Sequence, residues 1–145
     1  TQKVMLASGD EGGGADEVAA IIGAPRTGTL LALLTALHTK DKVAALATLS
    51  DASRQHTDMK FFARLLLEHL RAVMLLRNAP TQAESILAAF GPEARDKITT
   101  YAAEASPLNS HLLLRFLSAT EAIARSPIPS LPLEIAIIEV TEPTP

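Results

Sequence analysis

The feature that most constrains the fold is a long apolar run from Met59 to Asn78, MKFFARLLLEHLRAVMLLRN. Its polar positions recur at spacings of four, four and three residues, which places them along one narrow stripe of an α-helix. These positions are Lys60, Arg64, Glu68 and Arg71. Leucine, phenylalanine, valine and methionine cover most of the remaining circumference. Such a helix must pack on several sides, so we expect it inside a helical bundle or partly against another subunit.

The composition of the chain excludes several classes of function. It has 145 residues, enough for one domain, and its 48% hydrophobic content provides a core and argues against intrinsic disorder. A net charge of −3 gives no cationic surface for nucleic acid, and 3% aromatic residues give no platform for stacking bases. Arg71 and Arg77 interrupt the best candidate for a membrane span. The absence of cysteine excludes disulfides and thiolate ligands and is compatible with a cytoplasmic location, which we predict.

Helix signals follow one another along the chain, with capping residues before apolar runs and glycine or proline after them. The short connections favour an all-α fold, a single bundle of about six to seven helices. The expected elements are a short helix from Asp16 to Ile22, one from about Thr27 to His38, one capped by Asp41, the long apolar helix capped by Asp58, a short one opened by Thr81 and Glu84 and ended by Gly91, one from Pro92 to about Ala105, and one opened by Ser106 and Pro107.

The segment from Leu131 to Val140, LPLEIAIIEV, has an ambiguous secondary structure. Its isoleucines and valine favour a strand, whereas Ser130 as a cap and the apolar pair Leu131 and Ile135 favour a helix. No second strand-like segment is available as a partner, so we predict a helix. Pro132 lies inside this segment and is expected to shorten the helix or shift its start.

No arrangement of residues in the sequence predicts a catalytic, cofactor or metal site. The glycine cluster from Gly9 to Asp16 lacks a following Gly-Lys-Ser/Thr step, and its acidic residues would repel phosphate, so we interpret it as a linker. No histidine lies within a helical turn of another, and neither paired carboxylates nor a nucleophile elbow is present. The histidines are His38, His56, His69 and His111. The chemistry of the residues therefore predicts a helical interaction module.

The polar stripe of the long helix has two interpretations. Arg64, Glu68 and Arg71 are spaced for ion pairs at i, i+4 and i+3, each worth about a few tenths of a kcal/mol. In the first interpretation these residues form an ion-pair ladder on a solvated face. In the second, the arginines form hydrogen bonds across a contact with another subunit.

Three longer stretches occur in a defined order. The first, Asp16–Pro25, reads as a short helix with a hydrophobic-Gly step, and the second, Leu30–Asn78, joins a leucine-rich helix, a small-residue helix and the long apolar helix. The third, Leu112–Val140, contains an Arg-Ser-x-x-Pro-x-Leu-x-x-Glu step formed by Arg125, Ser126, Pro129, Leu131 and Glu134. In this order the stretches resemble the gamma/tau subunit of bacterial DNA polymerase III, the motor subunit of the sliding-clamp loader.

The resemblance implies a domain organisation and a function. Residues 1–23 would be the tail of an AAA+ lid domain and a linker, residues 24–140 a helical collar domain, and residues 141–145 a disordered tail. The collar would be non-catalytic, because the ATP-binding motifs of the family belong to other domains. It would hold the AAA+ modules in a pentameric ring through contacts with other gamma/tau copies, delta and delta-prime. The sequence lacks an initiator methionine, so we expect it to be a piece of a longer protein.

The apolar circumference of the long helix from Phe61 to Leu76, together with Phe116 and the closing helix with Ile135 to Ile138, would supply core and interface. We predict that the interface includes Phe61, Phe62, Arg64, Arg71, Leu75, Arg115, Phe116 and Glu134. We expect no cofactor and no direct contact with nucleic acid or membrane. The alternative is an unrelated helical adaptor that receives an amphipathic helix of its partner in a groove. An enzyme is the third possibility, and no constellation of residues supports it.

Overall fold

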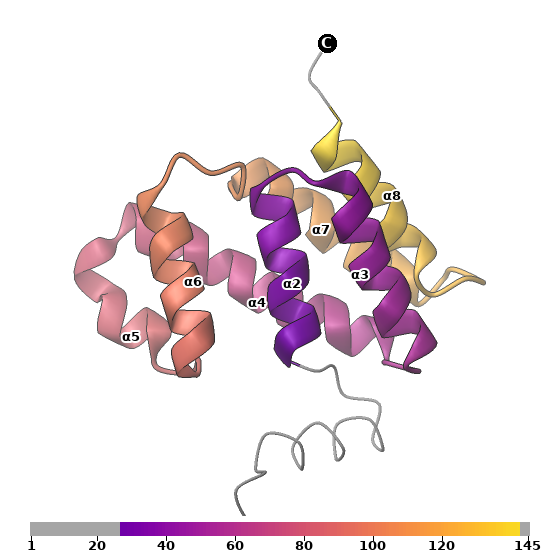
Figure 1. The fold of residues 1–145 in the computed structure, drawn as a ribbon, viewed down its shortest axis with the longest axis horizontal. Coiled ribbons are helices and arrows are strands. Elements are labelled where there is room, and N and C mark those ends of the chain that lie inside the picture. The colour runs from indigo at the N-terminus through magenta and orange to yellow at the C-terminus, as the bar shows by residue number, and fades with distance from the viewer. Residues whose placement is uncertain (1–26, 143–145) are drawn as a thin grey trace, which may run out of the picture.

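The protein is described by a computed structural model over residues 27–142, in which every regular element is a helix (Figure 1). The all-α prediction is therefore confirmed. The elements are α2 (Thr27–His38), α3 (Lys42–Arg54), α4 (Met59–Asn78), the 3-10 helix η1 (Pro80–Gln82), α5 (Ala83–Leu87), α6 (Pro92–Ala103), α7 (Ser110–Ile123) and α8 (Leu131–Thr141). The predicted helix at Asp16–Ile22 and the predicted lid segment, residues 1–23, lie outside the described residues.

Helix α4 is the longest element and extends across the molecule, with α5 and α6 near one end and α2 and α3 near the other (Figure 1). The Asp58 carboxylate accepts hydrogen bonds from the backbone N–H groups of Lys60 and Phe61, at 2.9 and 3.2 Å, and so caps the helix as predicted. Helices α2, α5, α6 and α7 pack against α4. The predicted polar stripe is the side that these neighbours leave open, since its four residues are all exposed.

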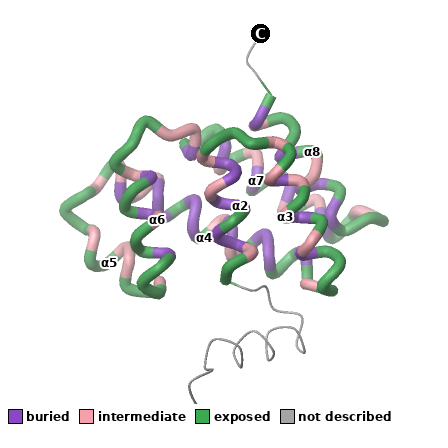
Figure 2. Tube along the Cα trace, viewed as in Figure 1, coloured by how far each residue is buried: buried purple, intermediate pink, exposed green. Residues whose placement is uncertain are grey.

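Helix α2 is the most enclosed element of the bundle. It contacts α3, α4, α6 and α8, and half of its residues are buried (Figure 2). They are Leu30, Leu31, Leu33, Leu34, Ala36 and Leu37. These residues fall on successive sides of the helix because they are nearly consecutive in sequence, so neighbours on several sides are needed to cover them. The core of the bundle is centred on this leucine-rich helix and on the face of α4 beneath it.

Several predicted helix ends differ from the structure. Thr81 does not cap an α-helix, because it lies in the middle of the 3-10 helix η1. No side chain caps the short α5 that follows. The segment 104–109 is a connection, and α7 begins at Ser110, where the Asn109 side chain accepts the cap hydrogen bond from the Leu112 N–H at 3.0 Å. Ser106 and Pro107 do not start this helix, since the Ser106 hydroxyl accepts a hydrogen bond from the Leu108 N–H in a local turn.

The helix predicted for the last segment is confirmed, and the expected effect of Pro132 is wrong. Helix α8 begins at Leu131, so the proline falls in the first turn, where its missing N–H has no helical partner to lose. The helix continues to Thr141, whose hydroxyl donates to the Ile137 carbonyl at 2.6 Å. The predicted tail therefore begins within the helix, and residues 143–145 lie outside the described part of the chain.

Arg77 joins three elements near the carboxyl end of α4. Its guanidinium donates to the carbonyl of Leu108 at 2.9 Å and to the carbonyl of Tyr101 at 3.1 Å. Tyr101 is in the last turn of α6, and Leu108 precedes α7. A charged donor here satisfies backbone oxygens that the end of α6 and the following connection leave without helical partners. The arginine thereby holds the connection between α6 and α7 against α4.

Candidate subunit interface

Helices α4, α7 and α8 share an apolar outer surface. Helix α7 packs against both α4 and α8, and the three helices carry six of the eight large apolar side chains that are exposed in the described residues. These six residues, which we call the α4–α7–α8 face, are Phe61, Leu114, Leu117, Leu131, Ile135 and Ile138. A monomeric surface normally scatters such side chains, so their concentration on three adjacent helices indicates a surface for association.

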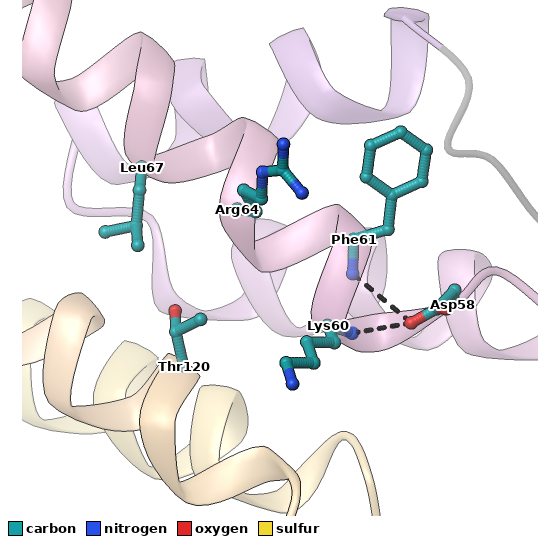
Figure 3. A pocket seen from close by; sticks show the side chains of 6 residues that line it. All are labelled: Asp58, Lys60, Phe61, Arg64, Leu67 and Thr120. Atoms are coloured by element: carbon teal, nitrogen blue, oxygen red, sulfur yellow. Dashed lines mark hydrogen bonds between the residues drawn. The ribbon is translucent and has the colours of Figure 1, made fainter.

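A groove of about 300 Å³ separates α4 from α7 on this face. Phe61, Arg64 and Leu67 line it from α4 and Thr120 lines it from α7. In Figure 3 the Leu67 side chain points toward Thr120, whereas the Phe61 ring points away from it. Asp58 lies at its end, where the carboxylate is occupied in capping α4. The walls are mainly apolar with a cationic rim. This arrangement suits the packing of a side chain from a partner rather than a chemical reaction.

A second groove, of about 260 Å³, lies between α7 and α8. Ser118 and Ala122 line it from α7, and Leu131 and Ile135 line it from α8. Arg115 lines the same groove and forms an ion pair with the Glu139 carboxylate of α8. Because the two grooves flank α7 on opposite sides, the exposed ridge of α7 lies between them. The α4–α7–α8 face is therefore one surface with a central ridge and a groove on each side.

Helix α8 explains why this surface is apolar. It buries Leu133, Ala136 and Ile137 against α2, α3 and α7. Its opposite side carries Ile135 and Ile138, which are 42% and 37% exposed, together with Glu134 and Glu139. Within the described residues no helix covers these two isoleucines, so large apolar side chains remain on the outward side of α8.

The structure places the predicted interface residues in three different environments. Arg64, Arg71 and Phe61 are exposed on α4, and Phe61 lines the first groove. Leu75 is half-buried on the same helix. Arg115 and Glu134 are also half-buried, and the Glu134 carboxylate accepts a hydrogen bond from the Ser130 hydroxyl at 3.1 Å.

Phe62 and Phe116 are corrections to the predicted set. Both have 0% exposure and belong to the hydrophobic core, so neither side chain is available on the surface of the described chain. Consecutive residues of a helix point about 100° apart, and therefore Phe61 and Phe62 cannot both face a partner. The sequence shows two adjacent phenylalanines, and only the packing of α4 decides which one is buried.

The predicted ion-pair ladder does not form. Among the ion pairs of residues 27–142, none involves Arg64, Glu68 or Arg71. The arginines on this stripe are exposed and have no acidic partner within the described part of the molecule. The interpretation in which they contact another subunit stays a prediction.

Leu114 and Leu117 belong to the face, and the sequence analysis missed them. Their exposed fractions are 63% and 43%. Both lie among the polar positions His111, Arg115 and Ser118, which mark the outward side of α7. Large apolar residues that interrupt a polar stripe were the available signal, because on an ordinary surface helix those positions would be polar.

Two histidines have structural surroundings that the sequence did not predict. The ring of His38 stacks on Tyr101 with centroids 3.9 Å apart, Nδ1 lies 2.7 Å from the Ser106 hydroxyl, and Nε2 lies 2.9 Å from the Glu104 carboxylate. This Ser-His-Glu arrangement lines none of the three cavities described for the molecule. The Ser106 hydroxyl also accepts a hydrogen bond from the Leu108 N–H. The three residues therefore join the end of α2 to the connection after α6 rather than forming a nucleophilic site.

His69 is buried in α4. Burial lowers its pKa from the ordinary value, and this effect exceeds the opposing effects of the hydrogen bond to the Leu65 carbonyl and the nearby charge of Glu68. Its ring packs edge-on against Phe90, with centroids 4.9 Å apart. The neutral ring donates from Nδ1 to the Leu65 carbonyl at 2.8 Å. His69 is therefore a core residue with a local hydrogen bond.

Within residues 27–142, no group of three or more histidine, aspartate or glutamate side chains is arranged to hold a metal ion. The helices of this part of the chain also include none with the length and apolar character needed to cross a bilayer.

The fold of the described residues defines a class of protein, the all-α helical bundle. The sequence matches the family described as DNA polymerase III subunits gamma and tau domain III over residues 14–145. The match covers most of the chain, which therefore belongs to this family. No curated protein and no solved structure matches the chain significantly.

Proposed function

We propose that residues 24–140 form a collar domain, a non-catalytic oligomerisation module of a clamp-loader gamma/tau subunit in the bacterial cytoplasm. In this proposal the collar joins the chain to other gamma/tau copies, to delta and to delta-prime in a pentameric ring. It thereby fixes the spacing of AAA+ modules, so that ATP hydrolysis in those modules can open and release a sliding clamp.

The observation that carries this proposal is the family match combined with the α4–α7–α8 face. Membership of the family supports a role in the clamp loader, and the unpaired apolar side of α7 and α8 offers a surface for stable contact. Stable interfaces bury about 800 Å² on each partner, and three adjacent helices are long enough to supply such an area.

Sedimentation of the chain across a wide concentration range, alone and with delta-prime, tests the proposal. We expect the mass to rise with concentration or a complex with delta-prime to form. A chain that stays monomeric at high concentration and ignores delta-prime would contradict the collar function. ATP turnover by the purified chain would contradict its non-catalytic nature.

The family match argues against an unrelated helical adaptor, since an unrelated protein would not match this family. A partner helix in the groove between α4 and α7 is still compatible with the geometry of Phe61 and Leu67. Binding of a helical peptide by a chain that neither self-associates nor binds delta-prime would support this alternative.

A further inference from the structure

The segment from Pro80 to Phe90 lies on the outside of the bundle. It contains η1 and α5, and none of its residues is buried (Figure 2). Its larger apolar residues recur at helical spacing and are partly buried against the core. They are Ile86, Leu87 and Phe90, with Ala83 one turn earlier. The segment therefore rests on the bundle by one side.

Helix α4 provides the main support for this segment. Helix α5 packs against α4 and η1, has five residues and has no side-chain cap at its start. A helix of this length is unstable by itself. The next helix, α6, differs, because it buries Ala94, Ile98 and Tyr101 and packs against both α4 and α2. The boundary between the two kinds of packing is Gly91, which precedes α6 and makes no side-chain cap.

Phe90 makes two specific contacts at the end of the segment. Its carbonyl accepts a hydrogen bond from the Arg95 Nε–H at 2.9 Å, and its ring packs edge-on against the ring of His69. His69 is 7% exposed. Phe90 is thus part of the cover that keeps water from the His69 ring. Movement of the segment away from α4 would remove this part of the cover.

The His69 ring fits the closed arrangement in its neutral form. Nδ1 donates to the Leu65 carbonyl, and Nε2 forms no hydrogen bond within residues 27–142. Protonation adds a charge and a donor at Nε2, and both require water or an acceptor. Burial accordingly lowers the pKa of His69. Because an open segment would let water reach the ring, proton uptake and opening are linked.

The charges around His69 do not offset this cost. The charge of Glu68 acts on the ring from the same helix, and its effect is smaller than that of burial. Within residues 27–142, none of the titratable groups on the elements packed against α4 forms an ion pair with His69. These groups are His38 of α2, Glu84 of α5, Glu93, Arg95, Asp96, Lys97 and Tyr101 of α6, and His111, Arg115 and Glu121 of α7.

We propose that residues 80–90 form a flap that opens as a unit about Ala79 and Gly91 while the other helices stay folded, and that protonation of His69 favours the open form. The contact between Phe90 and His69 is the latch of this flap. The flap lies at the end of the molecule away from α8 (Figure 1). The device therefore goes beyond the proposed collar function and does not depend on it.

Amide hydrogen exchange of the full 145-residue chain, followed by NMR, tests the flap. We expect the protection factor at Leu87 to be about a hundredfold or more below that at Leu34 in α2. Phe90→Ala should lower the protection at Leu87 by about a further tenfold, because the latch is lost. Phe61→Ala removes a 39% exposed phenylalanine near the other end of α4 and is the matched control. It should leave the protection at Leu87 unchanged.

A core variant distinguishes opening of the flap from unfolding of the whole bundle. Ile137→Val weakens the packing of α8, which is intact in both the closed and the open form of the flap. We therefore expect it to lower the protection at Leu34 several-fold and to leave the protection at Leu87 unchanged.

Exchange at two pH values tests the role of His69. From about pH 7.5 to about pH 5.5 the protection factor at Leu87, corrected for intrinsic exchange, should fall several-fold and at most about tenfold. The open form takes up a proton near pH 6.5, and the closed form resists it. His69→Leu and His69→Gln should both abolish this fall, and His111→Gln, at an exposed position, should retain it.

The results that would overturn the proposal are distinct for its two parts. Equal protection at Leu87 and Leu34, or equal losses at both in Ile137→Val, would show that α5 opens only with the whole bundle. Unchanged protection at Leu87 in Phe90→Ala would exclude the latch. A protection factor at Leu87 that is the same at both pH values, or that falls equally in the two His69 variants, would exclude control by His69.

Discussion

Helices α2 and α8 are both apolar around most of their circumference, yet the bundle covers them to different extents. Helix α2 has α3, α4, α6 and α8 as neighbours, and its four leucines from Leu30 to Leu34 are all buried. Helix α8 has α2, α3 and α7 as neighbours and leaves Ile135 and Ile138 exposed. The difference shows that an apolar sequence can serve the core in one helix and a surface in another. The number and placement of neighbouring helices decide which.

The largest expected difference between the two helices is in the free energy of unfolding. Leu34→Ala removes a side chain with 0% exposure and should cost about 2–5 kcal/mol, because the lost contacts leave a cavity in the core of α2. Ile135→Ala should cost less than about 1 kcal/mol in the monomer, since that side chain is 42% exposed. Urea unfolding at low protein concentration measures both. Equal losses would break the comparison.

A smaller contrast is expected within α8 itself. Ile137→Val should cost about 0.5–1.5 kcal/mol, because Ile137 is fully buried, whereas Ile138→Val should leave the monomer within about 0.5 kcal/mol of its original stability. Thermal unfolding of the pair at equal concentration provides the measurement. If Ile138→Val were the more harmful change in the monomer, the exposed side of α8 would have been assigned wrongly.

The hydrogen bond between α2 and α6 gives an effect of about 1 kcal/mol. The Tyr101 hydroxyl lies 2.9 Å from the Thr35 hydroxyl, and Tyr101→Phe removes this contact while keeping the stacked ring. Urea unfolding should show the loss. Thr39→Val is the control, because the Thr39 hydroxyl, just after α2, donates only to the Thr35 and Ala36 carbonyls of that helix.

The ion pair that joins α7 to α8 should contribute less. Arg115 and Glu139 keep 30% and 54% of their side-chain surface exposed, so Glu139→Gln should change the stability of the monomer by under about 0.5 kcal/mol. Chemical unfolding at low and high salt measures it. A loss above about 1 kcal/mol would mean that α8 is held by charge rather than by its buried face.

The smallest change at neutral pH is expected at His69, and it grows as the pH falls. The pKa of His69 is lowered by burial, so below about 6.5 the unfolded chain takes up a proton that the folded chain resists. The stability present above this pH is lost progressively down to the folded pKa and then becomes constant. His69→Leu should remove this part of the pH dependence, as measured by urea unfolding across the acidic range. His111→Gln, at an exposed position, is the control and should retain it.

The comparison of α2 with α8 also shows which parts of the fold could be predicted. The bounds of α2 and α4 and the caps Asp41 and Asp58 were predicted correctly, because apolar spacing and side-chain caps act over one or two turns of the chain. The starts of α5 and α7 were predicted wrongly. Thr81 and Ser106 are common capping residues, but Thr81 lies within η1 and the Ser106 hydroxyl accepts a hydrogen bond from the Leu108 N–H in a turn. Local signals of equal strength compete, and packing selects among them.

The candidate interface was predictable only in part. Sequence spacing identified the exposed stripe with Arg64 and Arg71, since polar residues at helical spacing mark a solvated side. It could not separate Phe61 from Phe62, and it missed Leu114 and Leu117. Core and surface leucines are chemically identical, so their roles depend on whether a neighbouring helix lies over them.

The sequence by itself determined that this chain is an all-helical member of the gamma and tau domain III family, because helix periodicity and the order of motifs are local properties of the chain. The tertiary structure alone decided that α2 is enclosed while one side of α7 and α8 stays open. Burial is a property of neighbours, and neighbours far apart in sequence are brought together only when the helices pack.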